Sequence, residues 1–102
     1  MQLPVENSQT KHSHWMYALL VKDGFGLTRD DLRKKLYKKG IETRDFFVPM
    51  HRQPALLELG LCKGEKYPVA DDIAQRGLYL PSGPAIAEKD IKFICETLRK
   101  LL

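Results

Sequence analysis

The segment from residue 27 to residue 40, LTRDDLRKKLYKKG, carries the start and stop signals of one amphipathic helix. Thr28 belongs to the residue types that cap helix N-termini, and Asp31 stands three residues later, where its side chain can return a hydrogen bond. Acidic residues occupy the first turn and lysines the last, as the helix dipole favours, and Gly40 suits the C-terminal cap. The sequence therefore predicts a helix from Thr28 to Gly40.

The charge of this segment has two interpretations. Five of the seven residues 33–39 are basic, and such a run is one signature of nucleic-acid binding. However, Leu32 and Leu36 lie four residues apart on one face, so the lysines cover the rest of an amphipathic helix. No zinc-finger spacing or RNA-binding aromatic motif accompanies the run. We interpret it as a solvated helix face and expect no nucleic-acid partner.

Two extended segments flank the helix. Residues 14–21, HWMYALLV, are aromatic and apolar without a polar face, which is typical of a buried strand. After the helix, residues 41–46, IETRDF, resume an extended chain in which Ile41 faces away from Glu42 and Arg44. We expect both segments to be strands.

The second half of the chain predicts three helices and a strand. Residues 54–60 and 68–77 each begin with a proline and end at a glycine, as short helices do. Residues 78–84, LYLPSGP, form a third strand that Pro81 breaks. Residues 87–102 form a closing amphipathic helix. Its apolar side comprises Ile91, Ile94, Cys95, Leu98, Leu101 and Leu102.

These elements predict an α/β (α+β) fold, in which a small sheet of about three strands carries helices on one face, like the small domain of fold type I aminotransferases. With 102 residues, the chain can hold one core but no deep enclosed cavity. Residues 1–13 form an N-terminal arm, and residues 14–102 form the domain. No apolar run is long enough to span a membrane, and the polar start does not resemble a signal peptide, so we expect a cytoplasmic protein without a membrane partner.

Metal and nucleophile signals are weak. Cys62 and Cys95 lack zinc spacing and do not form a disulfide framework, and Cys95 is expected to be a buried thiol on the last helix. His12 and His14 alternate without a third ligand, so no metal site is expected. No histidine and acid spacing supports Ser82 as a nucleophile.

The segment GIETRDFFVPMHRQP, residues 40–54, contains the candidate binding residues. Arg44 offers a planar fork of donors for phosphate or carboxylate, and Phe46 and Phe47 can line a sugar or base pocket. His51 can donate or accept a hydrogen bond near neutral pH. Structural roles are also open: an ion pair for Arg44 with Glu42, Asp45 or a helix acid, core packing for the phenylalanines, and a structural hydrogen bond for His51.

The ordered set of segments resembles the C-terminal small domain of the DegT family of pyridoxal-phosphate-dependent nucleotide-sugar aminotransferases. The matching pieces are WMYALLV (15–21), TRDDLRKKLYKKGIETRDFFVPMHRQP (28–54) and YPVADDIAQRGLYLPSGPAIAEKDI (67–91). Together they cover about residues 12–102. PMHRQP and LPSGP further resemble the perosamine synthase branch, whose enzymes aminate a GDP-linked 4-keto-6-deoxy sugar for O-antigen assembly.

The resemblance implies that the catalytic groups lie elsewhere. Transamination needs a lysine that holds pyridoxal phosphate as a Schiff base, a carboxylate for the pyridine nitrogen and a phosphate cradle. In the family these groups lie in the large domain, and no lysine here stands in a similar motif. We expect no catalytic residue, metal or cofactor in this chain, and pyridoxal phosphate only in the full-length enzyme. Arg44, Phe46, Phe47 and His51 are then substrate-side or architectural residues.

Two functions remain open. In the first, the chain is a truncated or isolated small domain of a nucleotide-sugar aminotransferase and is inactive alone. It then needs a large catalytic domain or a homodimer partner to complete the nucleotide-sugar cleft. Alternatively, it is a free-standing binding or regulatory module that retains this fold. A domain built to pack on a larger one should expose an apolar patch, which we expect around Trp15, Tyr17, Phe46 and Phe47.

Overall fold

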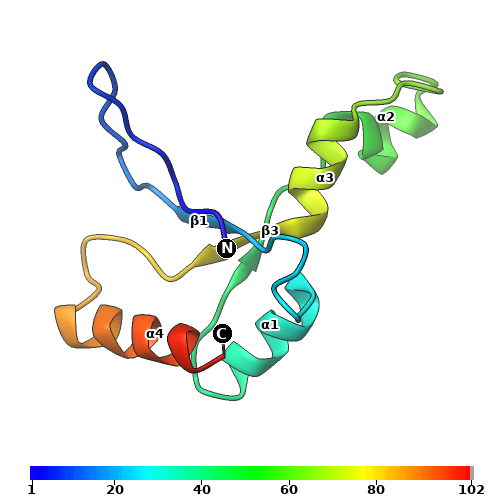
Figure 1. Cartoon of the computed structure of the whole chain (residues 1–102). Helices are drawn as coiled ribbons and strands as arrows, with labels where there is room; N and C mark the ends of the chain where they lie inside the picture. The colour runs from blue at the N-terminus through cyan, green and yellow to red at the C-terminus, as the bar shows by residue number, and fades with distance from the viewer. Residues whose placement is uncertain (102) are drawn as a thin grey trace.

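Residues 1–101, which the computed structural model describes, form three strands, four α-helices and one 3-10 turn (Figure 1). Their order along the chain is β1 (Tyr17–Leu20), α1 (Arg29–Tyr37), β2 (Arg44–Asp45), η1 (Met50–Arg52), α2 (Pro54–Glu58), α3 (Pro68–Arg76), β3 (Gly77–Leu80) and α4 (Glu88–Lys100). Every helix and strand predicted from the sequence is present, and the predicted fold class is confirmed.

The sheet has β3 in its centre, antiparallel to β1 on one side and to β2 on the other. β2 is shorter than the predicted strand over residues 41–46, because only Arg44 and Asp45 pair with β3. Continuing the two registers would place Pro81 opposite Glu42 and opposite Met16. A proline has no N–H to donate, so the ladders end there.

The core lies between one face of the sheet and two helices. Leu19 of β1 and Leu78 of β3 are directly paired and almost fully buried. Leu32 and Leu36 of α1 pack against them, as the spacing predicted. The core is completed by Val21, Ile41, Ile94 and Leu98. α1 and α4 therefore cover the same face of the sheet.

α1 has the caps that its sequence predicted. Thr28 Oγ1 accepts a hydrogen bond from the Asp31 N–H at 3.1 Å and donates one to Asp31 Oδ2 at 2.7 Å. This hydroxyl bond lowers the pKa of Asp31 from its ordinary value. At the other end, Gly40 adopts φ 79°, and the Ile41 N–H reaches Leu36 O at 3.0 Å. This is a Schellman closure, which turns the chain toward β2.

Ion pairs join α1 to the sheet. Asp45 of β2 binds Arg33 at 2.7 Å and Arg29 at 3.3 Å. The Arg29 side chain is only 17% exposed and also donates to Gly77 O at 3.4 Å. The other basic residues of the run, Lys34, Lys35, Lys38 and Lys39, are exposed, in agreement with a solvated helix face.

Two segments project away from the sheet (Figure 1). α3 leads outward from β3 and carries α2 at its far end; together with η1 we call residues 50–76 the arm helices. The N-terminal segment projects on the other side, turns at Asn7–Thr10, and pairs Gln2 with Leu20 of β1. The helices that cover the sheet are thus α1 and α4, whereas α2 and α3 stand clear of it.

Some expectations need correction. Cys95 is exposed rather than buried, because it lies beside the apolar stripe of α4 that faces the core. Gly77 caps α3, as expected, and with φ −80° it also begins β3. Leu102, expected on the apolar side of α4, lies outside the described residues. Within residues 1–101, no helix is long and apolar enough to cross a membrane.

Candidate functional site

Phe46 lies over the sheet face that is turned away from the core. Its ring stacks on Tyr79, with ring centroids 4.4 Å apart and planes inclined by 21°. The ring also covers Gly77, where a Cβ would overlap it. This close approach is what requires glycine at residue 77, since its backbone conformation is open to any residue.

Phe47 and Arg44 extend this aromatic surface. The Phe47 ring is tilted against Tyr79 with centroids 6.0 Å apart, and Phe47 is 67% exposed. Arg44 pairs directly with Tyr79 across the strands, which places both side chains on this face. We call Arg44, Phe46, Phe47 and Tyr79 the aromatic surface.

The guanidinium of Arg44 is accessible. It binds Glu42 at 3.0 Å, and the side chains of Arg44 and Glu42 are 74% and 72% exposed. An exposed ion pair of this kind stabilises a protein by only about 0–1 kcal/mol. A phosphate or carboxylate of a ligand can therefore replace Glu42 at the guanidinium fork at small cost.

His51 has different neighbours. It is buried in η1, and its Nε2 lies 2.9 Å from Asp71 Oδ1 of α3. The same Asp71 oxygen binds Arg52 Nε at 2.6 Å. Tyr67 packs on the imidazole with ring centroids 5.0 Å apart. His51 thus holds η1 against α3, and none of the residues of the aromatic surface takes part in these contacts.

A shallow pocket of about 420 Å³ adjoins His51. On its wall, Tyr67 donates a hydrogen bond to Glu65 at 3.0 Å, which raises the pKa of the phenol. Desolvation raises the pKa of the Cys62 thiol, and the Glu65 charge adds to this effect. A raised pKa makes the thiolate, which is the nucleophilic form of cysteine, less populated.

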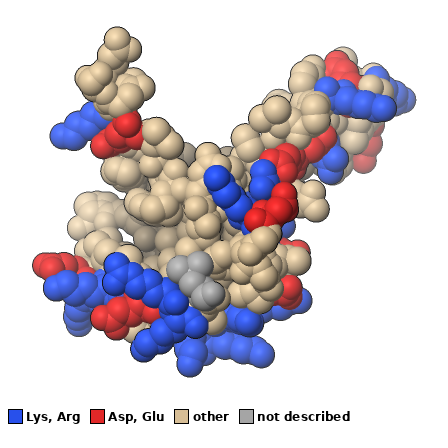
Figure 2. Space-filling view, viewed as in Figure 1, with Lys and Arg blue, Asp and Glu red and all other residues tan. Residues whose placement is uncertain are grey.

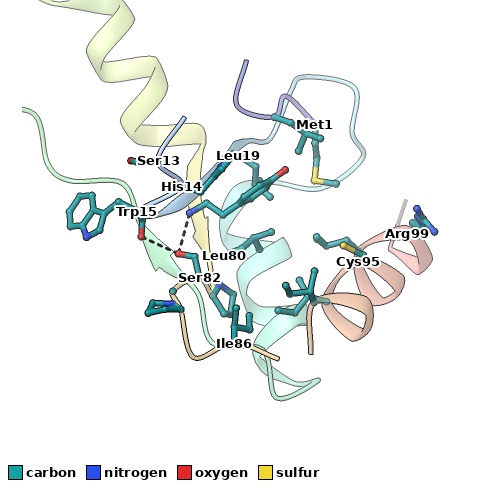
Figure 3. Close-up of a pocket in the computed structure, with 18 residues that line it drawn as sticks. Met1, Ser13, His14, Trp15, Leu19, Leu80, Ser82, Ile86, Cys95 and Arg99 are labelled. Carbon is teal, nitrogen blue, oxygen red and sulfur yellow. Dashed lines mark hydrogen bonds between the residues drawn. The ribbon is translucent and has the colours of Figure 1, made fainter. Parts of the chain in front are cut away.

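A larger apolar groove of about 1050 Å³ lies on the core side of the sheet, between β1, residues 80–86 and α4 (Figure 3). At one end, Ser82 Oγ donates to Trp15 O at 3.4 Å and accepts from the Tyr17 N–H at 3.3 Å. Met1 and Cys95 lie on opposite sides of the groove (Figure 3). Few charged side chains surround this hollow in Figure 2.

The expected apolar patch is therefore divided between two surfaces. Trp15 and Phe47 are exposed, as predicted, and Tyr17 and Phe46 are half-buried. Trp15 and Tyr17 line the groove, whereas the two phenylalanines belong to the aromatic surface. The part of the chain that the structure describes contains no group of three His, Cys, Asp or Glu side chains that could bind a metal ion.

The sequence analysis assigns no role to Tyr79 of the aromatic surface or to Gly77 beneath the Phe46 ring. Tyr79 was placed in a strand without a role, although the alternation Leu78, Tyr79, Leu80 already puts its ring opposite the buried leucine. Gly77 was taken only as the end of a helix. Its contact with Phe46 depends on the pairing of β2 with β3, and no local signal reveals that register.

Comparison with known proteins identifies the family. The sequence model of the DegT/DnrJ/EryC1/StrS aminotransferase family matches residues 1–99 of this chain. The chain belongs to this family. The resemblance that the segment order indicated is thereby confirmed.

The curated relatives that the chain matches include GDP-perosamine synthases. The chain is 34% identical over 100 residues to the enzyme of Escherichia coli O157:H7, covering 98% of this chain and 26% of the relative. It is 31% identical over 99 residues to the enzyme of Vibrio cholerae, covering 97% of this chain and 26% of the relative. The chain thus spans about a quarter of the length of the curated relatives it matches.

Solved structures agree on the fold. The chain superposes on a DegT DnrJ EryC1 StrS aminotransferase from Brucella abortus with a TM-score of 0.78 at 24% identity, covering 97% of this chain and 25% of that one. It superposes on the apo form of the sugar aminotransferase Spr1654 from Streptococcus pneumoniae with a TM-score of 0.81 at 21% identity, over 98% and 25% of the two chains. The fold is therefore one recurring quarter of these larger proteins.

Proposed function

We propose that this chain is the truncated or isolated small domain of a pyridoxal-phosphate-dependent sugar aminotransferase, and that it is inactive alone. The parent reaction would be amination of a nucleotide-linked 4-keto-6-deoxy sugar in polysaccharide or O-antigen synthesis. The observation that carries this proposal is the alignment of 98% of the chain with one quarter of a GDP-perosamine synthase.

The aromatic surface suits one wall of a nucleotide-sugar cleft. Phe47 presents an exposed ring beside Tyr79, on which a sugar or base can pack. Arg44 lies on the same face and can bind a diphosphate with two parallel hydrogen bonds. In this proposal Phe46 holds the surface together and His51 fixes the approach of the arm helices, so neither moves a proton.

The cofactor of the family does not fit the described residues. A Schiff-base lysine must be held in a partly desolvated site, where its amine can be neutral. Every lysine of this chain is exposed, and none lines the groove or the pocket beside His51. We therefore place the cofactor and the proton transfers in a large domain, and assign binding and packing to this chain.

A chimera tests the proposal. The last quarter of the E. coli O157:H7 relative is replaced by this chain, and transfer of an amino group to a GDP-linked 4-keto-6-deoxy sugar is measured. We expect turnover by the chimera and none by the 102-residue chain with added pyridoxal phosphate. In the chimera, Arg44→Gln should raise the KM for the nucleotide sugar about tenfold or more, whereas Lys35→Gln, an exposed charge on α1, should leave it unchanged.

Two results would contradict the proposal. Turnover by the chain alone would show that it carries its own catalytic groups. A folded chimera that binds pyridoxal phosphate but lacks turnover would instead favour a free-standing binding module, because this chain would then fail to complete the substrate cleft.

A further inference from the structure

We propose that an apolar segment of the large catalytic domain packs into the apolar groove between β1, residues 80–86 and α4. This inference rests on the proposed function, and adds to it the surface through which the small domain is held. The two faces of the sheet then have different partners. The aromatic surface binds the nucleotide sugar, and the groove on the other face packs against the large domain.

The composition of the groove favours a protein segment. Its walls are apolar on both sides, with Leu19 and Leu80 from the sheet and Ile94 and Leu98 from α4. Ile91 on the same wall is 46% exposed. Contiguous exposed apolar surface of this kind marks sites of protein association. A nucleotide sugar would find few hydrogen-bond partners there.

The relatives indicate which protein fills the groove. In the curated relatives and in the solved structures, this fold is about a quarter of the chain, so about three quarters accompany it. Met1 lines the groove, and Gln2 pairs with Leu20 on the edge of β1. Any chain that preceded Met1 would therefore emerge beside the groove, and its packing there would need only a short connection.

Charge argues against a second copy as the occupant. The chain carries a formal net charge of +4. Arg99 adds a guanidinium at one end of the groove (Figure 3). An apolar segment with an acidic residue near Arg99 complements this surface, whereas another copy would bring more positive charge.

The two cysteines allow a direct test. Cys95 is exposed and lines the groove, whereas Cys62 lies beside His51 on the arm helices. Iodoacetamide labelling is followed by peptide mass spectrometry in the isolated chain and in the chimera described above. We expect Cys95 to react readily in the monomeric isolated chain and at least tenfold more slowly in the chimera. The Cys62 rate serves as the internal reference.

A matched pair of variants on α4 makes the test specific. Ile91→Glu places a charge in the groove, and should restore Cys95 labelling in the chimera. Phe93 is exposed to a similar extent, 49% against 46%, but lies outside the groove, so Phe93→Glu should leave Cys95 protected. Both side chains are half exposed, so neither variant should prevent α4 from folding.

The other outcomes contradict either the inference or the proposed function. Rapid Cys95 labelling in a chimera that is active as an aminotransferase would agree with the proposed function, but it would show that the large domain does not cover the groove. Protection of Cys95 in the isolated chain together with a dimer mass in sedimentation would assign the groove to a second copy. A chimera that does not fold would show that the groove does not accept the relative's large domain. Protection of Cys95 in a chimera without aminotransferase activity would support packing of the large domain into the groove and would contradict the proposed function.

Discussion

The Phe46 ring occupies the space above Gly77 that a side chain at residue 77 would need. This relationship links β2 to β3 beyond their two paired residues, because Phe46 follows β2 directly and stacks on Tyr79 of β3. Two paired residues hold a strand only weakly, and cross-strand aromatic packing supplies the further stabilisation. The same stack positions Phe47 and Arg44 on the outer face of the sheet.

Replacing Gly77 by alanine should therefore destabilise the chain. The new methyl group forces the Phe46 ring from its place, at a cost of about 1–3 kcal/mol in the free energy of unfolding. Urea denaturation of the chain measures this loss. In a double-mutant cycle, Phe46→Ala should remove most of the penalty of Gly77→Ala. Additive effects would mean that the ring and residue 77 do not compete for space.

Thr28→Ala should weaken α1 at its N-terminus. The substitution removes the hydroxyl that accepts the Asp31 N–H, and loss of such a cap costs about 1 kcal/mol of stability. Thr28→Ser keeps the hydroxyl and should stay close to the parent chain in thermal denaturation. Equal losses in both variants would assign the effect to the Thr28 methyl group instead of the hydrogen bond.

Asp31 should make stability depend on pH in the acid range. Its hydrogen bond with the Thr28 side chain lowers its pKa in the folded chain from the ordinary value of 3.8. A lowered folded pKa stabilises the chain fully above pH 3.8, and this contribution is lost as the pH falls through the folded pKa. Asp31→Asn should therefore flatten the decline of stability in urea titrations below pH 3.8. An unchanged slope would contradict the assignment.

The sequence predicted the elements whose signals are local. The limits of α1 follow from Thr28 and Gly40, which act within a few residues of themselves, and both caps are present. Prediction from the sequence was poorer where a residue's structure depends on contacts with residues distant in the chain. β2 is short because Pro81, which directly follows β3, cannot continue the pairing, although residues 41–46 alone favour a longer strand. Cys95 is exposed because the contacts of α4 with the sheet, and not the helix pattern alone, select its buried face.

The sequence placed three residues of the aromatic surface close together in the chain but did not predict how they are arranged. Arg44, Phe46 and Phe47 are neighbours in sequence and meet on one surface. His51 follows them closely, yet η1 turns it toward Asp71. The groove could not be foreseen, because its walls come from opposite ends of the chain and meet only in the folded structure.

The His51–Asp71 contact should hold the arm helices to one another without supporting the core. His51→Ala leaves Asp71 with Arg52 alone and removes a buried hydrogen bond, for which we expect a local loss of about 1–3 kcal/mol. Amide hydrogen exchange should then accelerate in residues 50–76, while the amides of α1 keep their rates. His51→Gln can place an amide nitrogen near the position of Nε2, and should recover part of the protection. If exchange accelerates equally in α1 and in the arm helices, His51 supports the whole fold, and the local role assigned to it here is wrong.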